Sequence, residues 1–321
     1  MLLSDWVFHQ RKESPMNRIT HYDIIGDVHG RYGTLVSLLE TLGYRQESGI
    51  WSQPGHQAMF VGDVIDKGEA PGAVLRLVRR MVDAGHAHMV IGNHELNWVS
   101  AAYAYQDDPR RFVQATREHP DRQRLVEEFA AQDNGRDALL DHFQWLREQP
   151  LFLQIGECRV VHAWWHEASI QRLKAMGIRC LDDRAMAAYA ETYSPAYYAM
   201  DRVIAGCEHT MRSRASASAF RTVRRRVRWW PNDVGLIHDM ELEPTLAREH
   251  GYPNHAMPVF FGHYAMTGTP IRLGRNVACL DYAAAYGGEL VAYTHSPETP
   301  LSPTCFTAQP VVSPTPVVHQ P

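Results

Sequence analysis

The sequence contains few cysteines, and none of them forms a Cys-x-x-Cys pair. The five are scattered along the chain, at Cys158, Cys180, Cys207, Cys279 and Cys305. An odd, scattered set argues against a disulfide framework and against a thiolate zinc site. We therefore predict a protein of a reducing compartment, the cytoplasm.

Long apolar runs and a strong net charge are also absent. No segment approaches the length of a membrane span, and the N-terminus lacks the basic and apolar regions of a secretory signal, so we expect no membrane partner. The net charge is −4 with histidine counted as neutral, which gives no general attraction for nucleic acid. The 321 residues, 45% of them hydrophobic, can instead bury the core of one large α/β domain or two small ones.

Apolar runs that alternate with helical periodicity are what the chain does contain. Three short runs predict buried strands at residues 22–26, 58–62 and 88–92. Between them, apolar residues recur at helical spacing and stop before Gly43 and Gly85. This β-α-β-α-β order predicts a mainly parallel inner sheet.

The rest of the chain divides less sharply. Residues 120–149 have the pattern of an amphipathic helix, and further strands are expected at 158–162, 258–262, 277–281 and 289–293. The last 25 residues include seven prolines and no Lys or Arg, a composition typical of a disordered or extended tail. We predict four parts: an N-terminal extension at 1–18, one domain at 19–296, a cap or insertion within it at about 166–257, and a Pro-rich disordered tail at 297–321.

Three of the expected strands end in a related signature. Each continues into a glycine followed by Asp or Asn, in the segments Gly26-Asp27-Val28-His29-Gly30, Gly62-Asp63-Val64-Ile65-Asp66-Lys67-Gly68 and Gly92-Asn93-His94-Glu95. Ligands of open α/β sheets bind outside the carboxyl ends of the strands. We therefore expect Asp27, Asp63 and Asn93 to face one site.

Two later strand ends add His162 and His263. Oxygen and imidazole ligands in this mixture suit Mn²⁺, Fe or Zn²⁺ better than a soft metal. Two neighbouring ions need a bridging carboxylate, and Asp63 on the middle strand is the natural choice. Two-metal sites of this kind activate a hydroxide and clamp the oxygens of a phosphoryl group.

Each piece alone has an ordinary explanation. A Gly-Asp-x-His segment is often a turn with a capping aspartate, and a single histidine at a strand end is more often a core residue than a ligand. Five such pieces in this order, each at a strand end, favour a metal site over five coincidences.

These blocks resemble those of the calcineurin-like metallophosphoesterases of the phosphoprotein phosphatase type. The bacterial branch, with diadenosine tetraphosphate hydrolases and phage-type protein phosphatases, is similar. The resemblance covers roughly residues 22–165 and 258–293, and it is specific for the metal core rather than for the substrate. It implies an α/β fold, a four-layer sandwich of two mixed β-sheets flanked by helices.

The resemblance also implies roles for the site residues. Asp27, His29 and Asp63 would hold one metal ion, and Asp63, Asn93, His162 and His263 the second. His94 would be the proton donor, and Asp66 would orient it and favour its charged form, as a leaving-group acid requires.

One position departs from the family pattern. Lys67 stands where the family has an arginine, and a lysine offers a point charge instead of a planar fork. We expect Lys67 to bind substrate phosphate, with the substrate class as the property most affected. Arg202, Arg221 or Arg224 could supply a second phosphate contact.

The predicted function is hydrolysis of phosphoesters with two divalent metal ions, Mn²⁺ first and Fe or Zn²⁺ next, similar to a serine/threonine protein phosphatase. The substrate would be a phosphoprotein, a nucleotide or a small phosphoester, and nucleic acid is not expected as a partner. Two alternatives stay open: a dinucleoside polyphosphate hydrolase, and a catalytically weak metal-bearing binding module. The presence of both His94 and Asp66 favours an enzyme over the module.

Overall fold

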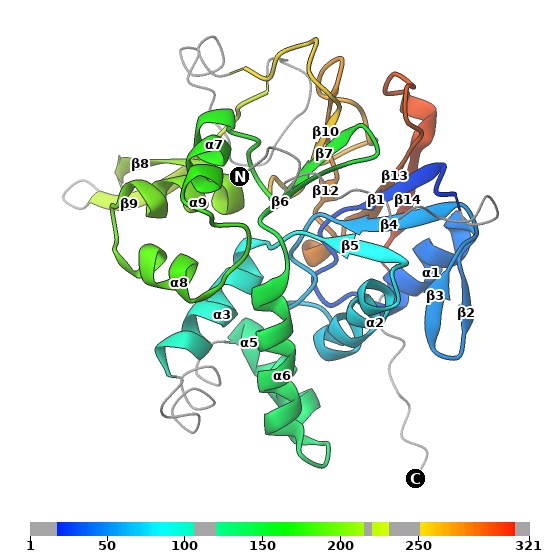
Figure 1. The fold of residues 1–321 in the computed structure, drawn as a ribbon, viewed down its shortest axis with the longest axis horizontal. Helices are drawn as coiled ribbons and strands as arrows, with labels where there is room; N and C mark the ends of the chain where they lie inside the picture. Colours follow the sequence, from blue (N-terminus) through cyan, green and yellow to red (C-terminus); the bar gives the residue numbers. More distant parts are fainter. Residues whose placement is uncertain (1–17, 106–119, 215–219, 231–250, 312–321) are drawn as a thin grey trace.

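The computed structural model describes residues 18–105, 120–214, 220–230 and 251–311. The strands of the larger sheet come from both ends of this chain (Figure 1). Its order is β12-β13-β1-β4-β5, with β14 also paired to β13. Its members are β1 (His21–Ile25), β4 (His56–Phe60), β5 (Ala87–Met89), β12 (Asp281–Tyr282), β13 (Glu289–His295) and β14 (Phe306–Pro310).

Strands β1, β4 and β5 run parallel to one another, as the β-α-β-α-β pattern predicts, while β13 runs antiparallel to β1. The second sheet has the order β11-β10-β7-β6. It is also mixed, because β7, β10 and β11 are parallel and β6 is antiparallel to β7. Its members are β6 (Phe152–Ile155), β7 (Cys158–Val161), β10 (Val259–Phe261) and β11 (Val277–Cys279).

The two sheets pack against each other through buried apolar side chains. Phe260 of β10 lies with its ring centroid 5.0 Å from that of Tyr293 on β13. Helices α1 (Tyr32–Leu42) and α2 (Pro71–Asp83) cover the larger sheet, and α2 starts with the proline that suits a first helical position. On the smaller sheet, Lys174 of α7 (Glu167–Ala175) lies over the ring of Phe152. The expected α/β sandwich with two mixed sheets and flanking helices is confirmed.

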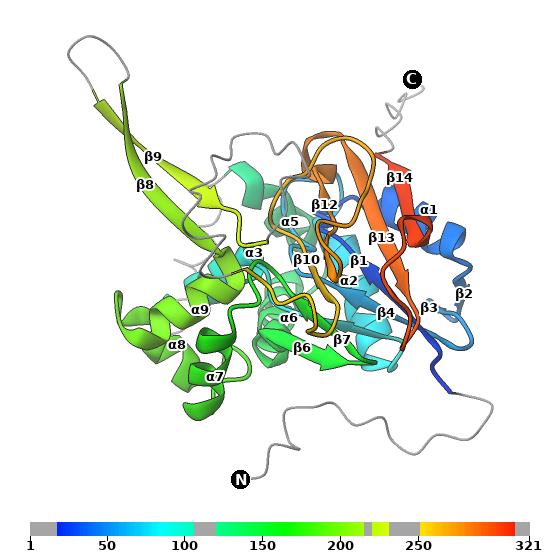
Figure 2. The same cartoon turned by 90° about the horizontal axis from the view of Figure 1, so that it is seen from above.

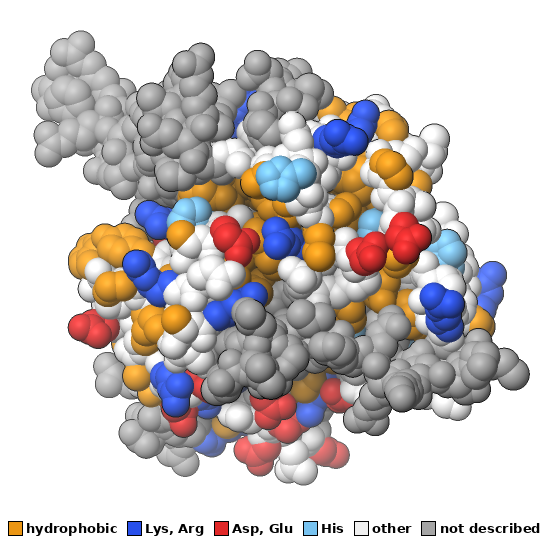
Figure 3. Space-filling model, turned by 45° about the horizontal axis from the view of Figure 1, so that its top comes forward, with side chains coloured by type: hydrophobic (Ala, Val, Ile, Leu, Met, Phe, Trp, Pro, Cys, Tyr) orange, Lys and Arg blue, Asp and Glu red, His pale blue; other side chains and the backbone are white. Residues whose placement is uncertain are grey.

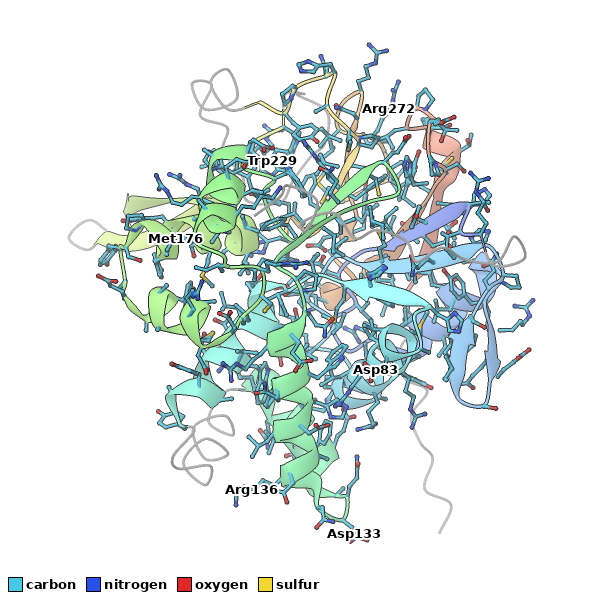
Figure 4. All side chains as sticks on the ribbon, in the orientation of Figure 1. Asp83, Asp133, Arg136, Met176, Trp229 and Arg272 are labelled. Carbon is cyan, nitrogen blue, oxygen red and sulfur yellow. The ribbon has the colours of Figure 1, made fainter. Side chains whose placement is uncertain are left out.

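Two sequence predictions of element bounds need correction. Residues 120–149 form two helices, α5 (Pro120–Ala130) and α6 (Gly135–Glu148). A turn at residues 131–134 separates them, and Asn134, which precedes α6, has a left-handed φ of 56° that a continuous helix does not allow. Figure 4 shows Asp133 and Arg136 at this turn, at the far end of the helix pair from the sheets. The predicted strand 277–281 is likewise two strands, β11 and β12, which belong to different sheets.

Two further segments are regular. Helix α3 (Asn93–Ala104) follows β5 and packs on α6. A small hairpin, β2 (Arg45–Glu47) with β3 (Ile50–Ser52), lies between α1 and β4 and was not foreseen.

The described part of the region predicted as a cap contains three helices and a hairpin. The helices are α7, α8 (Asp183–Ala190) and α9 (Pro195–Ala205), and the hairpin joins β8 (Cys207–Arg214) to β9 (Phe220–Val227). Side chains of His166, Asp182 and Ser194 cap the three helices by accepting a backbone N–H. Figure 2 shows the hairpin projecting away from both sheets. A covering role for this region stays a prediction.

The predicted disordered tail is wrong in its first part. Residues 306–310 form β14, which pairs with β13 from Phe306 to Pro310. The ring of Phe306 packs edge-on against Tyr293 at 4.9 Å, and Leu301 is buried. Composition misses this strand because two apolar anchors suffice when an existing edge strand offers its backbone. Residues 312–321 of the predicted tail and residues 1–17 of the predicted extension lie outside the described residues.

The described surface has no single dominant charge on the face drawn in Figure 3, where acidic and basic side chains are interspersed. Within the described ranges, no helix is both long and apolar enough to span a membrane.

Candidate metal centre

The carboxyl ends of β1, β4 and β5 bring the three sequence signatures together. The turns that follow these strands, and the turn after β10, contain several residues with a left-handed φ. Residues other than glycine rarely adopt this conformation. Five of the eleven such residues in the described chain belong to the predicted site: His29, Asp63, Asp66, Lys67 and His263. Backbone strain concentrated in this way is typical of functional sites, where sharp turns aim side chains inward.

Asp63 occupies the middle of this arrangement. Its Oδ2 lies 3.4 Å from His162 Nε2, 3.7 Å from His29 Nε2 and 3.9 Å from His94 Nε2. Its Oδ1 accepts the backbone N–H of His94 at 2.9 Å. Two groups of possible metal-binding atoms share Asp63, each within 4.8 Å: His29, Asp63 and His94, and Asp63, His162 and His263.

Asn93 lies between the two later histidines. Its Oδ1 is 3.1 Å from His162 Nε2 and 2.8 Å from His263 Nδ1. His162 donates its Nδ1–H to the carbonyl of Val61 at 2.8 Å. A backbone carbonyl can only accept, so this bond leaves the Nε2 lone pair directed at Asp63 and Asn93, as in many metal-binding histidines.

Asp27 completes the centre from β1. Its Oδ2 accepts the backbone N–H of His263 at 3.0 Å. Its Oδ1 is buried and has no hydrogen-bond partner among the described residues, and the same is true of His263 Nε2. Gly262 provides the space for this carboxylate, since a Cβ there would lie 1.8 Å from Asp27 Oδ1.

These observations fit a divalent metal pair. Buried polar atoms normally have partners, so an unpartnered carboxylate oxygen and an unpartnered imidazole nitrogen in one site fit the binding of a cation. The donor set of oxygens and imidazoles suits hard to borderline ions. Burial lowers the pKa of His29 to about 3, which keeps its imidazole in the neutral form that binds metals. Although burial opposes it, the Asp63 carboxylate raises the pKa of His162 to about 9, a sign of how strongly the site attracts positive charge.

His94 and Asp66 form a hydrogen-bonded pair beside the centre. The His94 Nδ1 to Asp66 Oδ2 distance is 2.7 Å, and Trp98 Nε1 donates to the other Asp66 oxygen, also at 2.7 Å. Burial alone would lower the pKa of His94, but the carboxylates of Asp63 and Asp66 outweigh it and raise that pKa above its ordinary value. The pair is therefore arranged to hold a proton on His94.

Glu95 is a site residue that our sequence reasoning missed. It is fully buried, and its carboxylate accepts the backbone N–H groups of Asp63 at 2.8 Å, Gly92 at 2.9 Å and Val64 at 3.0 Å. It thus connects the turn after β4, which carries Asp63, to the turn after β5, which carries Asn93. The spacing of Gly92 and Glu95, that of a capping box at a helix start, was the available signal.

Lys67 lies at the rim of the centre. Its Nζ donates to the hydroxyl of Tyr286 at 2.9 Å. After burial, its positive charge is among the smaller causes that lower the pKa of His29, and it partly opposes the rise in the pKa of His94. The ammonium is therefore close enough to act on groups of the centre. Whether it binds phosphate stays a prediction.

The arginines considered for a second phosphate contact are less well placed. The side chains of Arg221 and Arg224 lie outside the described residues. Within the described residues, Arg202 forms no side-chain hydrogen bond or ion pair with the centre. The described residue that does reach it is Arg226, which donates to the carbonyl of His263.

Comparison with known proteins points to one family. Residues 20–211 match the model of the calcineurin-like phosphoesterases. An asymmetrical bis(5'-nucleosyl)-tetraphosphatase of Halalkalibacterium halodurans is 36% identical over 153 residues, which make up 46% of this chain and 59% of that protein. The chain thus spans less than two thirds of the length of this relative.

A second relative is covered more fully. A symmetrical bis(5'-nucleosyl)-tetraphosphatase of Aromatoleum aromaticum is 26% identical over 284 residues, 84% of this chain and 91% of that protein. Among solved structures, a cold-active protein-tyrosine phosphatase of a psychrophilic Shewanella species aligns with a TM-score of 0.50 at 16% identity, over 88% of this chain and 80% of that one. A likeness at this identity concerns the fold.

Proposed function

Because the chain belongs to the calcineurin-like phosphoesterase family, we propose that it hydrolyses phosphoesters with two divalent metal ions. One observation carries this proposal. Two buried ligand atoms without a hydrogen-bond partner in the described chain, Asp27 Oδ1 and His263 Nε2, occur in the same site as the hydrogen-bonded His94 and Asp66. A decayed binding module has no need of a proton-holding histidine beside its metal site.

The geometry supports the following roles. Asp27, His29 and Asp63 would hold one ion, and Asp63, Asn93, His162 and His263 would hold the other. When bound, the ions supply Lewis-acid activation of water and neutralise charge on the phosphoryl oxygens. Mn²⁺ is the proposed metal, with Fe and Zn²⁺ as the next choices, because the donors are oxygens and imidazoles without a thiolate.

His94 then supplies the proton that the leaving oxygen needs. Its Nε2 faces the centre, 3.9 Å from Asp63 Oδ2, while its Nδ1 is held by Asp66. Asp66 fixes the ring and, with Asp63, favours the protonated form, so the acid is ready when the phosphorus–oxygen bond breaks. Lys67 contributes positive charge at the rim, where the extra negative charge of the transition state develops.

For the substrate, we propose a dinucleoside polyphosphate. Both relatives described above are bis(5'-nucleosyl)-tetraphosphatases, and one of them is covered over 91% of its length. Four cysteines of the described chain carry free thiols, which supports the cytoplasm as the compartment.

A substrate panel tests this proposal. The purified protein is supplied with Mn²⁺ and assayed on diadenosine tetraphosphate, a phosphoserine peptide and p-nitrophenyl phosphate. We expect the largest kcat/KM for the dinucleotide. A preference for the phosphopeptide would identify a protein phosphatase instead, and a protein that binds metal but cleaves none of the three would support the binding module.

A further inference from the structure

Tyr286 is an exposed aromatic residue, and its hydroxyl contacts the proposed phosphate-binding group, the ammonium of Lys67. Its side chain is 74% exposed, although tyrosine rings elsewhere in the chain, such as Tyr264 and Tyr293, are buried. Burying an aromatic ring is favourable, so an exposed one beside an active centre is available for a ligand.

Comparison with a second exposed tyrosine shows what is unusual about it. Tyr193 is 75% exposed, but its ring packs on those of Tyr197 and Tyr198, each with a centroid distance of 6.3 Å. The ring contact recorded for Tyr286 among the described residues is with the ammonium of Lys67, 4.7 Å from the ring centroid. The remaining ring surface of Tyr286 is open to solvent.

The turn that carries Tyr286 is held in place from the centre. The guanidinium of Arg31 donates to the carbonyls of Ala284 and Ala285, at 3.1 and 3.0 Å, and pairs with Glu69 at 3.4 Å. Glu69 follows Lys67 closely in the same loop, so one arginine ties the aromatic turn to the loop of the proposed phosphate-binding lysine. A surface fixed in this way loses little conformational entropy when a ligand binds.

Lys67 connects the ring to the centre. Its ammonium donates to the hydroxyl of Tyr286, while its neighbours in the chain contact site residues: Asp66 holds His94, and the N–H of Gly68 donates to the carbonyl of His29 at 2.7 Å. A substrate with one phosphoryl group at the metals and a second charge near Lys67 would place its next group over the ring. In a nucleoside polyphosphate, that next group is the nucleoside.

We propose that Tyr286 is a specificity residue: its ring stacks on a nucleobase of the substrate, beyond the phosphate held by Lys67. This inference rests on the proposed function and adds to it the chemical group that is recognised. An aliphatic leaving group gains nothing from the ring, whereas every base has a flat π-surface that can stack on it.

The test compares two inhibitors that differ by an adenosine. Adenosine triphosphate and inorganic tripolyphosphate compete with p-nitrophenyl phosphate hydrolysis at a fixed free Mn²⁺ concentration, and the ratio of their inhibition constants measures what adenosine adds. For the unaltered protein we expect adenosine triphosphate to bind about tenfold more tightly, the order of one base–aromatic stack. Tyr286→Ala should bring the ratio close to one.

Two further variants separate stacking from other effects. Tyr286→Phe keeps the ring and loses the hydroxyl that accepts from Lys67, so it should keep most of the ratio. Tyr193→Ala removes an equally exposed ring from the α8–α9 region and should leave the ratio as it is. If Tyr286→Ala weakens both inhibitors equally, the residue acts only through Lys67 and the proposal is overturned. Equal binding of the two inhibitors by the unaltered protein would overturn it as well.

The outcome is separate from that of the substrate panel. A protein that cleaves the dinucleotide but shows an unchanged ratio in Tyr286→Ala retains the proposed function and loses the stacking role. A protein that leaves the dinucleotide intact, but whose ratio falls in Tyr286→Ala, loses the proposed substrate and keeps the nucleobase contact.

Discussion

Two buried aspartates of the larger sheet, one within β1 and one just beyond its carboxyl end, serve different purposes. Asp23, in the middle of β1, is fully buried and accepts three hydrogen bonds, from Tyr44 at 3.0 Å, His56 at 2.8 Å and Thr294 at 2.6 Å. At the carboxyl end, Asp27 is also buried, yet only one of its oxygens has a hydrogen-bond partner within the described chain. The two residues stand four positions apart in the chain.

This difference separates a structural aspartate from a ligand. A buried carboxylate whose oxygens are both hydrogen-bonded stabilises the fold, because each partner would be left unsatisfied without it. A buried carboxylate with a free oxygen destabilises the fold unless a cation compensates. Four experiments can break or sharpen this comparison.

The largest effect is expected at Asp63. Asp63→Asn replaces the shared carboxylate by a neutral amide, which bridges two cations poorly, so hydrolysis should be abolished on every substrate of the panel. Metal content, measured by elemental analysis after gel filtration, should fall at the same time. A variant that keeps two metals per chain and full activity would exclude the bridging role.

His94→Asn should have the next largest effect, with the metals retained. Loss of a positioned acid lowers kcat by about 10²- to 10⁴-fold. Good leaving groups need little protonation, so the loss should be smaller for p-nitrophenyl phosphate than for an alkyl phosphate. Equal losses on the two substrates would show that His94 acts in another way.

The comparison itself is tested most directly by a matched pair of isosteric variants. Asp23→Asn removes one acceptor and turns an amide toward existing donors, so the metal-free protein should lose about 1–3 kcal/mol of stability while hydrolysis is retained. Asp27→Asn removes a buried, partly unpartnered charge, so the metal-free protein should keep its stability or gain some, while hydrolysis is lost. Thermal unfolding with and without chelator gives both results. An equal loss of stability in the two metal-free variants would contradict the distinction.

The carboxyl end of the sheet was largely predictable, and the reason is local. Each turn there carries its ligand within a few residues of a strand that its own apolar run identifies, as with Asp27, Asp63 and Asn93. Parallel strands then bring the turns together without further information. Glu95 was missed although it lies within one of these blocks. Its capping-box spacing predicts only the bond from the N–H of Gly92, whereas the bonds from Asp63 and Val64 come from another turn and leave no local pattern.

Contacts between distant segments were not predictable in this way. Lys67 and Tyr286 are 219 positions apart, and nothing in the 281–288 segment distinguishes an exposed tyrosine from a buried one. The same limit explains the error in the tail. Whether a Pro-rich segment forms a strand depends on whether another strand offers it an open edge. Here β13 offers that edge, and the composition of the tail itself does not reveal it.

The smallest expected effect concerns that tail, which begins near the amino end of the sheet. Truncation after Ser296 removes β14 together with Leu301 and Phe306, so a strand pairing and two apolar contacts are lost, and β13 gains an open edge. Burial of one apolar side chain contributes about 1.5–3 kcal/mol, and partial burial less, so we expect a loss of about 2–3 kcal/mol. Since 1 kcal/mol shifts Tm by about 2–4 °C in a domain of this size, Tm should fall by roughly 4–12 °C.

Truncation after Val311 keeps β14 and separates the strand's contribution from that of residues 312–321. The centre lies at the opposite end of β1, so kcat per folded molecule should change little in either truncation. An unchanged Tm after removal of residues 297–321 would show that β14 adds no stability and that the larger sheet is complete at β13.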